Sequence, residues 1–134
     1  MPEANLIRHP GLAAAADLSA AANQFKGVKI TAANRVNLCT VLGEFCFGVL
    51  YDKPGLGVRA EVVVQGSPKM RAGAAIAVGE RVRVAADGEF VPAVSALGNT
   101  DHAVAVAITA AAAAGEIFQG RLLGGAEGLN TAVS

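Results

Sequence analysis

The stretch from Glu44 to Gly73, EFCFGVLYDKPGLGVRAEVVVQGSPKMRAG, restricts the possible folds more than any other part of the chain. Between Val58 and Gln65 the residues follow a period of two, as in a strand with one buried face. The run from Phe45 to Tyr51 is apolar on both faces, which is typical of a strand that is buried on both sides. Asp52–Gly55 separates the two runs and favours a tight turn, because proline presets one dihedral and glycine accepts positive φ.

Similar signals recur along most of the chain. Asp87-Gly88 predicts a hairpin with a type I′ turn, and Pro92 predicts an edge position or a strand end. The alternation of Val and Ile with Ala from Ala103 to Thr109 favours a strand over a helix. Further strands are expected at residues 24–31, 36–41, 69–71, 74–78, 81–85, 89–94 and 117–123. About eight to ten short strands with Gly and Pro turns between them predict an all-β barrel or sandwich.

The apolar content is high, but it is carried by small side chains. Hydrophobic residues make up 53% of the 134 residues, whereas aromatic residues make up 4% and tryptophan is absent. A core of Ala and Val buries little area per residue, so assembly is an expected source of extra stability. The alanine face of residues 103, 105 and 107 fits a tight internal core layer, which we favour, or the close approach of another subunit.

The N-terminal segment, Met1 to Ala22, is predicted to be an arm. Its first part contains Pro2, Pro10 and Gly11 and shows no sustained period, and an alanine-rich piece follows. An isolated helix of that length is marginal in water. Two interpretations remain open: a disordered leader, or an extended arm that orders on a partner by adding a strand to an exposed edge. The expected organisation is an arm at 1–22, a β domain at 23–123 and a flexible tail at 124–134.

The two cysteines, Cys39 and Cys46, are interpreted as reduced and buried. A turn at Leu42-Gly43 would place them opposite each other at a hydrogen-bonded pair of strand positions, where side chains diverge. A disulfide is therefore disfavoured. Free thiols fit a reducing compartment.

The sequence offers no constellation of catalytic or ligand-binding residues. His9 lies in the expected arm and His102 in a polar loop beside Asp101, and neither has a catalytic context. We expect no enzyme activity, no cofactor and no metal. The formal net charge is zero, which argues against nucleic-acid binding. Apolar runs are too short to span a membrane, and no secretory signal is visible, so synthesis in the cytoplasm is expected.

Several short motifs, in this order and spacing, resemble the phage head decoration (capsid cement) protein family, whose members are similar in fold to the decoration protein of lambdoid phages. The matching stretches are Phe47–Leu50, Asp52–Pro54, Ala60–Val64, Lys69–Gly73, Val82–Gly88 and Ala110–Leu123. The resemblance implies a small β-barrel (β-tulip) domain with an extended N-terminal arm. The longer arm, the cysteine pair and the Gly-rich tail depart from the family pattern.

The resemblance also implies a function. A family member binds the outer surface of the expanded bacteriophage capsid, commonly as a homotrimer, and cements neighbouring major capsid protein subunits against internal DNA pressure. The chain would then be made in the bacterial host cytoplasm and be located in the virion. The alternative is a virion-surface adhesin module that binds host glycans, although the shortage of Trp and Tyr argues against it. The expected capsid or subunit interface comprises Asn5, Leu6, Ile7, Arg8, His9, Leu12, Arg59, Arg81 and Arg83.

Overall fold

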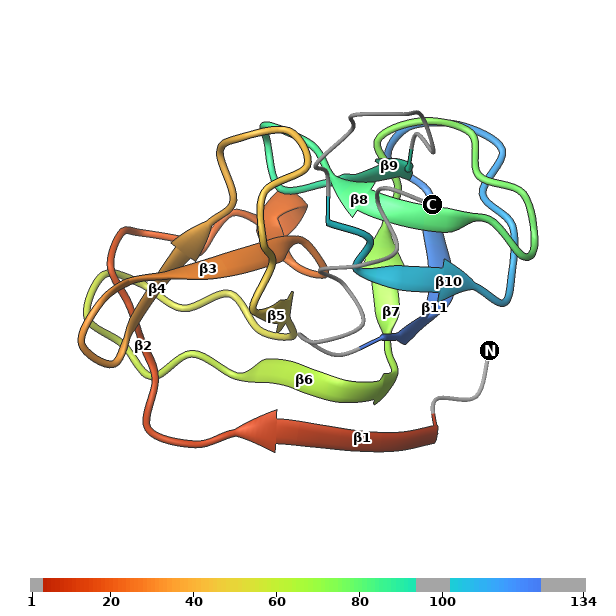
Figure 1. Ribbon diagram of the computed structural model, residues 1–134. Coiled ribbons are helices and arrows are strands. Elements are labelled where there is room, and N and C mark those ends of the chain that lie inside the picture. Colours follow the sequence, from red (N-terminus) through yellow and green to blue (C-terminus); the bar gives the residue numbers. More distant parts are fainter. Residues whose placement is uncertain (1–3, 94–101, 124–134) are drawn as a thin grey trace.

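The structure, a computed structural model, describes residues 4–93 and 102–123, which fold into two β-sheets (Figure 1). The six-stranded sheet has the order β1-β6-β5-β3-β4-β2 and the five-stranded sheet has the order β7-β11-β10-β8-β9. The strands of the first sheet are β1 (Ala4–His9), β2 (Ala13–Ala14), β3 (Gly27–Ala32), β4 (Arg35–Leu38), β5 (Gly48–Leu50) and β6 (Val62–Ser67). Those of the second are β7 (Lys69–Arg71), β8 (Arg81–Val84), β9 (Phe90–Pro92), β10 (Ala105–Ala107) and β11 (Ile117–Leu122). The all-β class is confirmed.

The expected barrel is corrected to a sandwich-like pair of curled sheets. In the six-stranded sheet one antiparallel bridge joins Ala13 to Arg59, just before β6. In the five-stranded sheet one parallel bridge joins Ala72 to Phe90, beside its two edge strands. Each sheet therefore curls so that two of its distant segments meet at one bridge. A single bridge does not close a sheet into a barrel.

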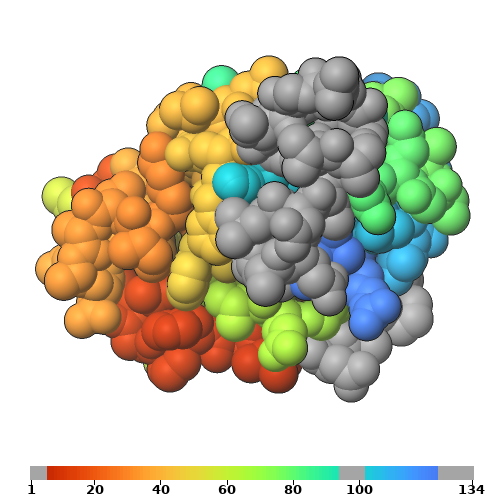
Figure 2. Space-filling view, viewed as in Figure 1, coloured from red at the N-terminus to blue at the C-terminus, as the bar shows by residue number. Residues whose placement is uncertain are grey.

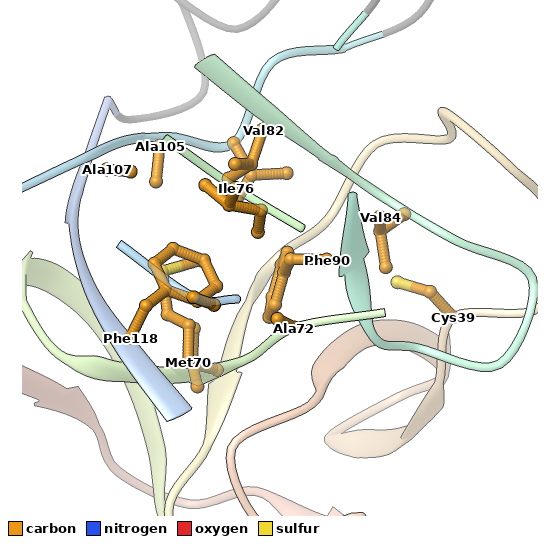
Figure 3. Close-up of a cluster of buried hydrophobic side chains, with 13 residues drawn as sticks. Cys39, Met70, Ala72, Ile76, Val82, Val84, Phe90, Ala105, Ala107 and Phe118 are labelled. Carbon is orange, nitrogen blue, oxygen red and sulfur yellow. The ribbon is translucent and has the colours of Figure 1, made fainter. Parts of the chain in front are cut away.

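The larger hydrophobic cluster gathers side chains from the inner face of the five-stranded sheet (Figure 3). Phe90 and Phe118 are fully buried there, and the small residues Ala105 and Ala107 lie beside them. Ala103 is also buried, at 2% exposure. The alanine face is therefore an internal core layer, as favoured from the sequence, and the small side chains let the strands approach closely.

A second cluster lies on the other face of the six-stranded sheet. It contains Leu12, Ala14, Leu18, Val28, Val36, Leu50, Ala60 and Val62. β5 lies between the two clusters, because Val49 belongs to the first cluster and its neighbour Leu50 to the second. The expectation of a strand buried on both faces is therefore confirmed for β5.

Several strands agree with the prediction from the sequence. β7 has the expected bounds, and β9 is an edge strand that ends at Pro92. The β8–β9 hairpin is present, but its turn is not type I′. Only Gly88 has a positive φ, of 87°, and its amide donates to the carbonyl of Ala85. This is the geometry of a type I turn followed by a glycine bulge.

Three expected strands are shorter than predicted or missing. β5 begins at Gly48 rather than at residue 45, because the preceding residues form a turn stabilised by Glu44. β6 begins at Val62, and residues 58–60 form a bridge with the N-terminal segment instead. Residues 74–78 make one bridge, from Ile76 to Ala111, and no strand.

The segment predicted to be an arm is part of the fold over its described residues. β1 pairs antiparallel with β6, and Ala13–Ala14 pairs with β4. Leu18 is buried, and its amide donates to the carbonyl of Pro54 at 2.8 Å. Residues 4–22 therefore complete the six-stranded sheet and its core. The expected tail, 124–134, lies outside the described residues.

Cys39 and Cys46 are free thiols, as expected; Cys39 is buried as predicted, whereas Cys46 is only half-buried. No hairpin pairs them, but Gly43 turns the chain with a φ of 77°, and the two thiols lie close to each other. The Cys46 thiol also contacts the carbonyl of Gly48 at 3.2 Å. The hydrogen bond with Cys46, together with burial, raises the pKa of the Cys39 thiol.

Candidate partner-binding surfaces

Over residues 4–93 and 102–123 no group of three or more His, Cys, Asp or Glu side chains converges as a metal site. The Nδ1–H of His9 donates to the carbonyl of Pro10 at 2.8 Å, and the ring lies edge-on to Phe47. The ring of His102 packs edge-on against the ring of Phe45, with 6.0 Å between the ring centres. Its sequence neighbour Asp101 lies outside the described residues.

Among the described residues there is no helix long and apolar enough to cross a membrane.

β1 carries five of the nine expected interface residues and forms one edge of the six-stranded sheet, where it lines the lower border of the molecule in Figure 2. Ile7 is 52% exposed. The Arg8 guanidinium pairs with Glu61 at 3.2 Å and lies over the Tyr51 ring, 5.7 Å from its centre. His9 is exposed and Leu6 is half-buried, and Asn5 also lies on this strand. The pairing with β6 is irregular, with register shifts on either side of Ile7.

Leu12 does not belong to a surface, which corrects the expectation for this residue. Its side chain is only 3% exposed and lies in the second hydrophobic cluster. The carbonyl of Leu12 accepts the amide of Ala60 at 2.9 Å. The chain therefore changes at Gly11 from an edge strand to a buried segment.

Arg81 and Arg83 lie on the outward face of β8, as expected, while Val82 and Val84 are fully buried. Arg81 is directly opposite Val106 of β10, and Val106 is opposite Arg121 of β11. Residues opposite each other in neighbouring strands share a face. This face therefore carries a row of two arginines with a valine between them.

Arg59 lies at the far end of the six-stranded sheet, away from the arginines of β8. It is exposed and bridges Ala13, which is itself in register with Arg35 of β4. The residues expected at an interface did not include Arg35, which lies outside the predicted strands at 24–31 and 36–41. No local sequence signal could reveal that Arg35 and Arg59 lie on either side of Ala13, because the three residues come from separate segments.

A further exposed group is apolar and lies in the loop between β4 and β5. Val41, Leu42 and Phe45 are 56%, 49% and 45% exposed. The Glu44 carboxylate holds the loop by accepting the amides of Thr40 and Val41 at 2.7 and 2.8 Å.

The charge state of Glu44 follows from these contacts. Burial alone would raise the pKa of Glu44. The hydrogen bonds from Val41 and Thr40, together with the ammonium of Lys29, outweigh burial and lower that pKa below its ordinary value. The loop is therefore held by an ionised carboxylate at neutral pH.

Comparison with known proteins gives a likeness in fold rather than in sequence. No protein-family model matches the chain, and no curated protein sequence matches it significantly. Among solved structures, the chain is similar to the head fiber gp8.5 N base of bacteriophage phi29, with a TM-score of 0.59 and 14% sequence identity. The match covers 88% of this chain and 94% of the other. The chain therefore has a fold found in a phage head-associated protein.

Proposed function

We propose that this chain is a structural protein of a bacteriophage virion that binds the outer surface of the expanded capsid and cements neighbouring major capsid protein subunits. The observation that carries the proposal is the fold match with the phi29 head fiber base, which extends over 88% of this chain. A match over nearly the whole of both chains indicates one shared architecture rather than a common hairpin.

The exposed surface supports a role in assembly. β1 offers a sheet edge, and edges of this kind are natural sites for joining another chain through backbone hydrogen bonds. Exposed arginines occur on both sheets, and Arg is enriched in protein interfaces. A cement protein acts by complementary surface and needs no chemistry. A homotrimer fits this role, because three weak contacts on one lattice combine into strong binding.

The test is co-sedimentation of the purified protein with expanded and with unexpanded capsids of its phage. We expect saturable binding to the expanded shell only. A variant that lacks residues 1–9 tests the part played by β1, because it removes the edge strand and leaves Leu12 in place. Binding to neither shell, together with specific signals on a glycan array, would overturn the proposal in favour of a host-glycan adhesin.

A further inference from the structure

We propose that Cys39 and Cys46 form an intramolecular disulfide that closes the β4–β5 loop once the protein leaves the reducing cytoplasm. Exposure to oxidising surroundings rests on the proposed function, because a virion is released from its host cell. The pairing itself rests on the positions of the two thiols. Both cysteines are free, and their thiols lie close to each other.

The two cysteines meet at Gly27, the only glycine of β3. A Cβ placed on Gly27 would lie 2.8 Å from Sγ of Cys46, 3.0 Å from Cγ2 of Val84 and 3.2 Å from Cζ of Phe90. The Cys46 sulfur therefore occupies the space of a missing side chain. The amide of Cys39 donates to the carbonyl of Gly27 at 3.0 Å, and Cys39 belongs to the same buried cluster as Val84 and Phe90 (Figure 3).

Neither cysteine lies within a strand, so the divergence of side chains in a strand pair does not separate them. Cys39 follows the end of β4, and Cys46 precedes the start of β5. The Cys46 thiol donates to the carbonyl of Gly48 at 3.2 Å, which holds its sulfur on the inner side of the loop. Loop residues can make the small shift that brings two neighbouring sulfurs to a bonded distance of about 2 Å.

The bond would connect two strands that do not pair with each other. β4 and β5 lie on opposite sides of β3 in the six-stranded sheet. A disulfide between the end of one and the start of the other would hold β3 between them. It would also close the loop that carries the exposed side chains of Val41, Leu42 and Phe45. Closing a loop removes conformations from the unfolded chain and so stabilises the fold.

The order of the reaction follows from access to the two sulfurs. Cys46 is partly exposed and Cys39 is fully buried, so a soluble disulfide such as glutathione disulfide reaches Cys46 first. The Cys46 thiolate attacks one glutathione sulfur, and a mixed disulfide forms while one glutathione leaves. Cys39 then attacks the Cys46 sulfur, and the second glutathione leaves. Each cysteine loses one electron, glutathione disulfide gains both, and the two thiol protons end on the two glutathione molecules.

The first step also makes the second one easier. Interaction with the Cys46 thiol, followed by burial, raises the pKa of the Cys39 thiol, and the charge of Glu44 adds to this while Lys29 opposes it. In the mixed disulfide the Cys46 sulfur has no proton to give and no charge to repel a thiolate. The largest cause of the raised pKa is then removed, and Cys39 lies beside the sulfur that it attacks.

The test treats the purified, reduced full-length chain with glutathione disulfide. Remaining thiols are blocked with N-ethylmaleimide, and the chain is cut by a glutamate-specific protease. Glu44 lies between the two cysteines in the sequence, so cleavage after it places them in separate peptides. These peptides stay together only through a disulfide, which mass spectrometry detects without reductant and which a reduced sample should lack.

We expect the monomer to give the two peptides joined, with the mass of both less two hydrogen atoms. Glutathione that persists on Cys46, a disulfide between two chains, or no reaction at either cysteine would each overturn the inference. No capsid enters this measurement. A negative result therefore leaves the proposed function standing, and a failure to bind capsids leaves the disulfide standing.

Cys39→Ala and Cys46→Ala are the matched variants. Cys39→Ala should accumulate glutathione on Cys46, whereas Cys39 should stay unmodified in folded Cys46→Ala. The oxidised wild type should melt about 5 °C or more above the reduced wild type. Cys46→Ala should melt at one temperature in both buffers. Equal melting of the two wild-type forms would overturn the claim that the bond closes and stabilises the loop.

Discussion

The amide of Ala60 donates a hydrogen bond to the carbonyl of Leu12 at 2.9 Å, and both side chains are buried in the same hydrophobic cluster. We expect Leu12→Ala to lower the free energy of unfolding by about 2–4 kcal/mol, because it removes buried area and leaves a cavity. Ile7→Ala, on the exposed edge strand, should change it by less than about 0.5 kcal/mol. Urea unfolding of both variants measures this, and equal effects would contradict the burial of Leu12.

Truncation at two points separates the edge strand from the buried segment. A chain that lacks residues 1–9 should fold, because it loses only β1 and its pairing with β6. A chain that lacks residues 1–18 should not fold stably, since it also loses Leu12, Ala14 and Leu18 from the core. Circular dichroism and thermal melts distinguish the two. A cooperative thermal transition in the chain that lacks residues 1–18 would show that folding does not require Leu12, Ala14 and Leu18.

Gly48 has no room for a side chain. A Cβ at this position would lie 2.6 Å from the carbonyl oxygen of Val63. We expect Gly48→Ala to destabilise the protein by about 2 kcal/mol or more through backbone displacement. Gly55→Ala is the control, since the nearest atom to its Cβ would be 3.6 Å away and its φ is not positive. Equal melting temperatures for the two variants would contradict the close approach of β5 and β6 at Gly48.

The Glu44 carboxylate makes the stability of the β4–β5 loop depend on pH. Its pKa is lowered in the folded state, so its contribution is present above the ordinary pKa of about 4.3 and is lost as pH falls through the folded value. We expect Glu44→Gln to cost about 1 kcal/mol at pH 7. That difference should be smaller at pH 3 than at pH 7, because the carboxylate becomes protonated as the pH falls through its lowered pKa. Urea unfolding at both pH values is the measurement, and a constant difference would argue against the hydrogen bonds to Thr40 and Val41.

The two cysteines should differ in reactivity. Cys39 is fully buried with a raised pKa, whereas Cys46 is partly exposed. Because the thiolate is the reactive form, a maleimide probe should modify Cys46 first. Cys39 should react only after unfolding in urea, where both thiols become equally accessible. Peptide mapping after timed labelling gives the order, and early labelling of Cys39 would mean that this part of the core opens readily.

Local patterns were enough to predict much of the fold. β7, the hairpin at Gly88 and the strand at Ala105–Ala107 follow from periodicity and turn residues within a few positions. The burial of Leu12 could not be predicted this way. Its segment has no sustained period, and its place is decided by hydrogen bonds to residues 58–60, far away in the sequence.

The candidate surface was partly predictable for the same reason. Arg59, Arg81 and Arg83 stand at outward positions of alternating stretches, and alternation alone places them on a surface. Arg59 and Arg35 lie on either side of Ala13 because the N-terminal segment passes between their strands. A sequence that is interpreted one segment at a time cannot show that arrangement. The loop at Glu44 is similar, because a carboxylate that binds two amides replaces the strand that the apolar run predicts.

β6 and β7 are separated only by Pro68, and they belong to different sheets. β1 lies antiparallel along β6, as Figure 1 shows. A pull along the axis of β1 would therefore load its hydrogen bonds to β6 in shear, all together rather than one after another. The force would continue along a single backbone through the proline corner into the second sheet. The two sheets would consequently bear tension as one mechanical unit.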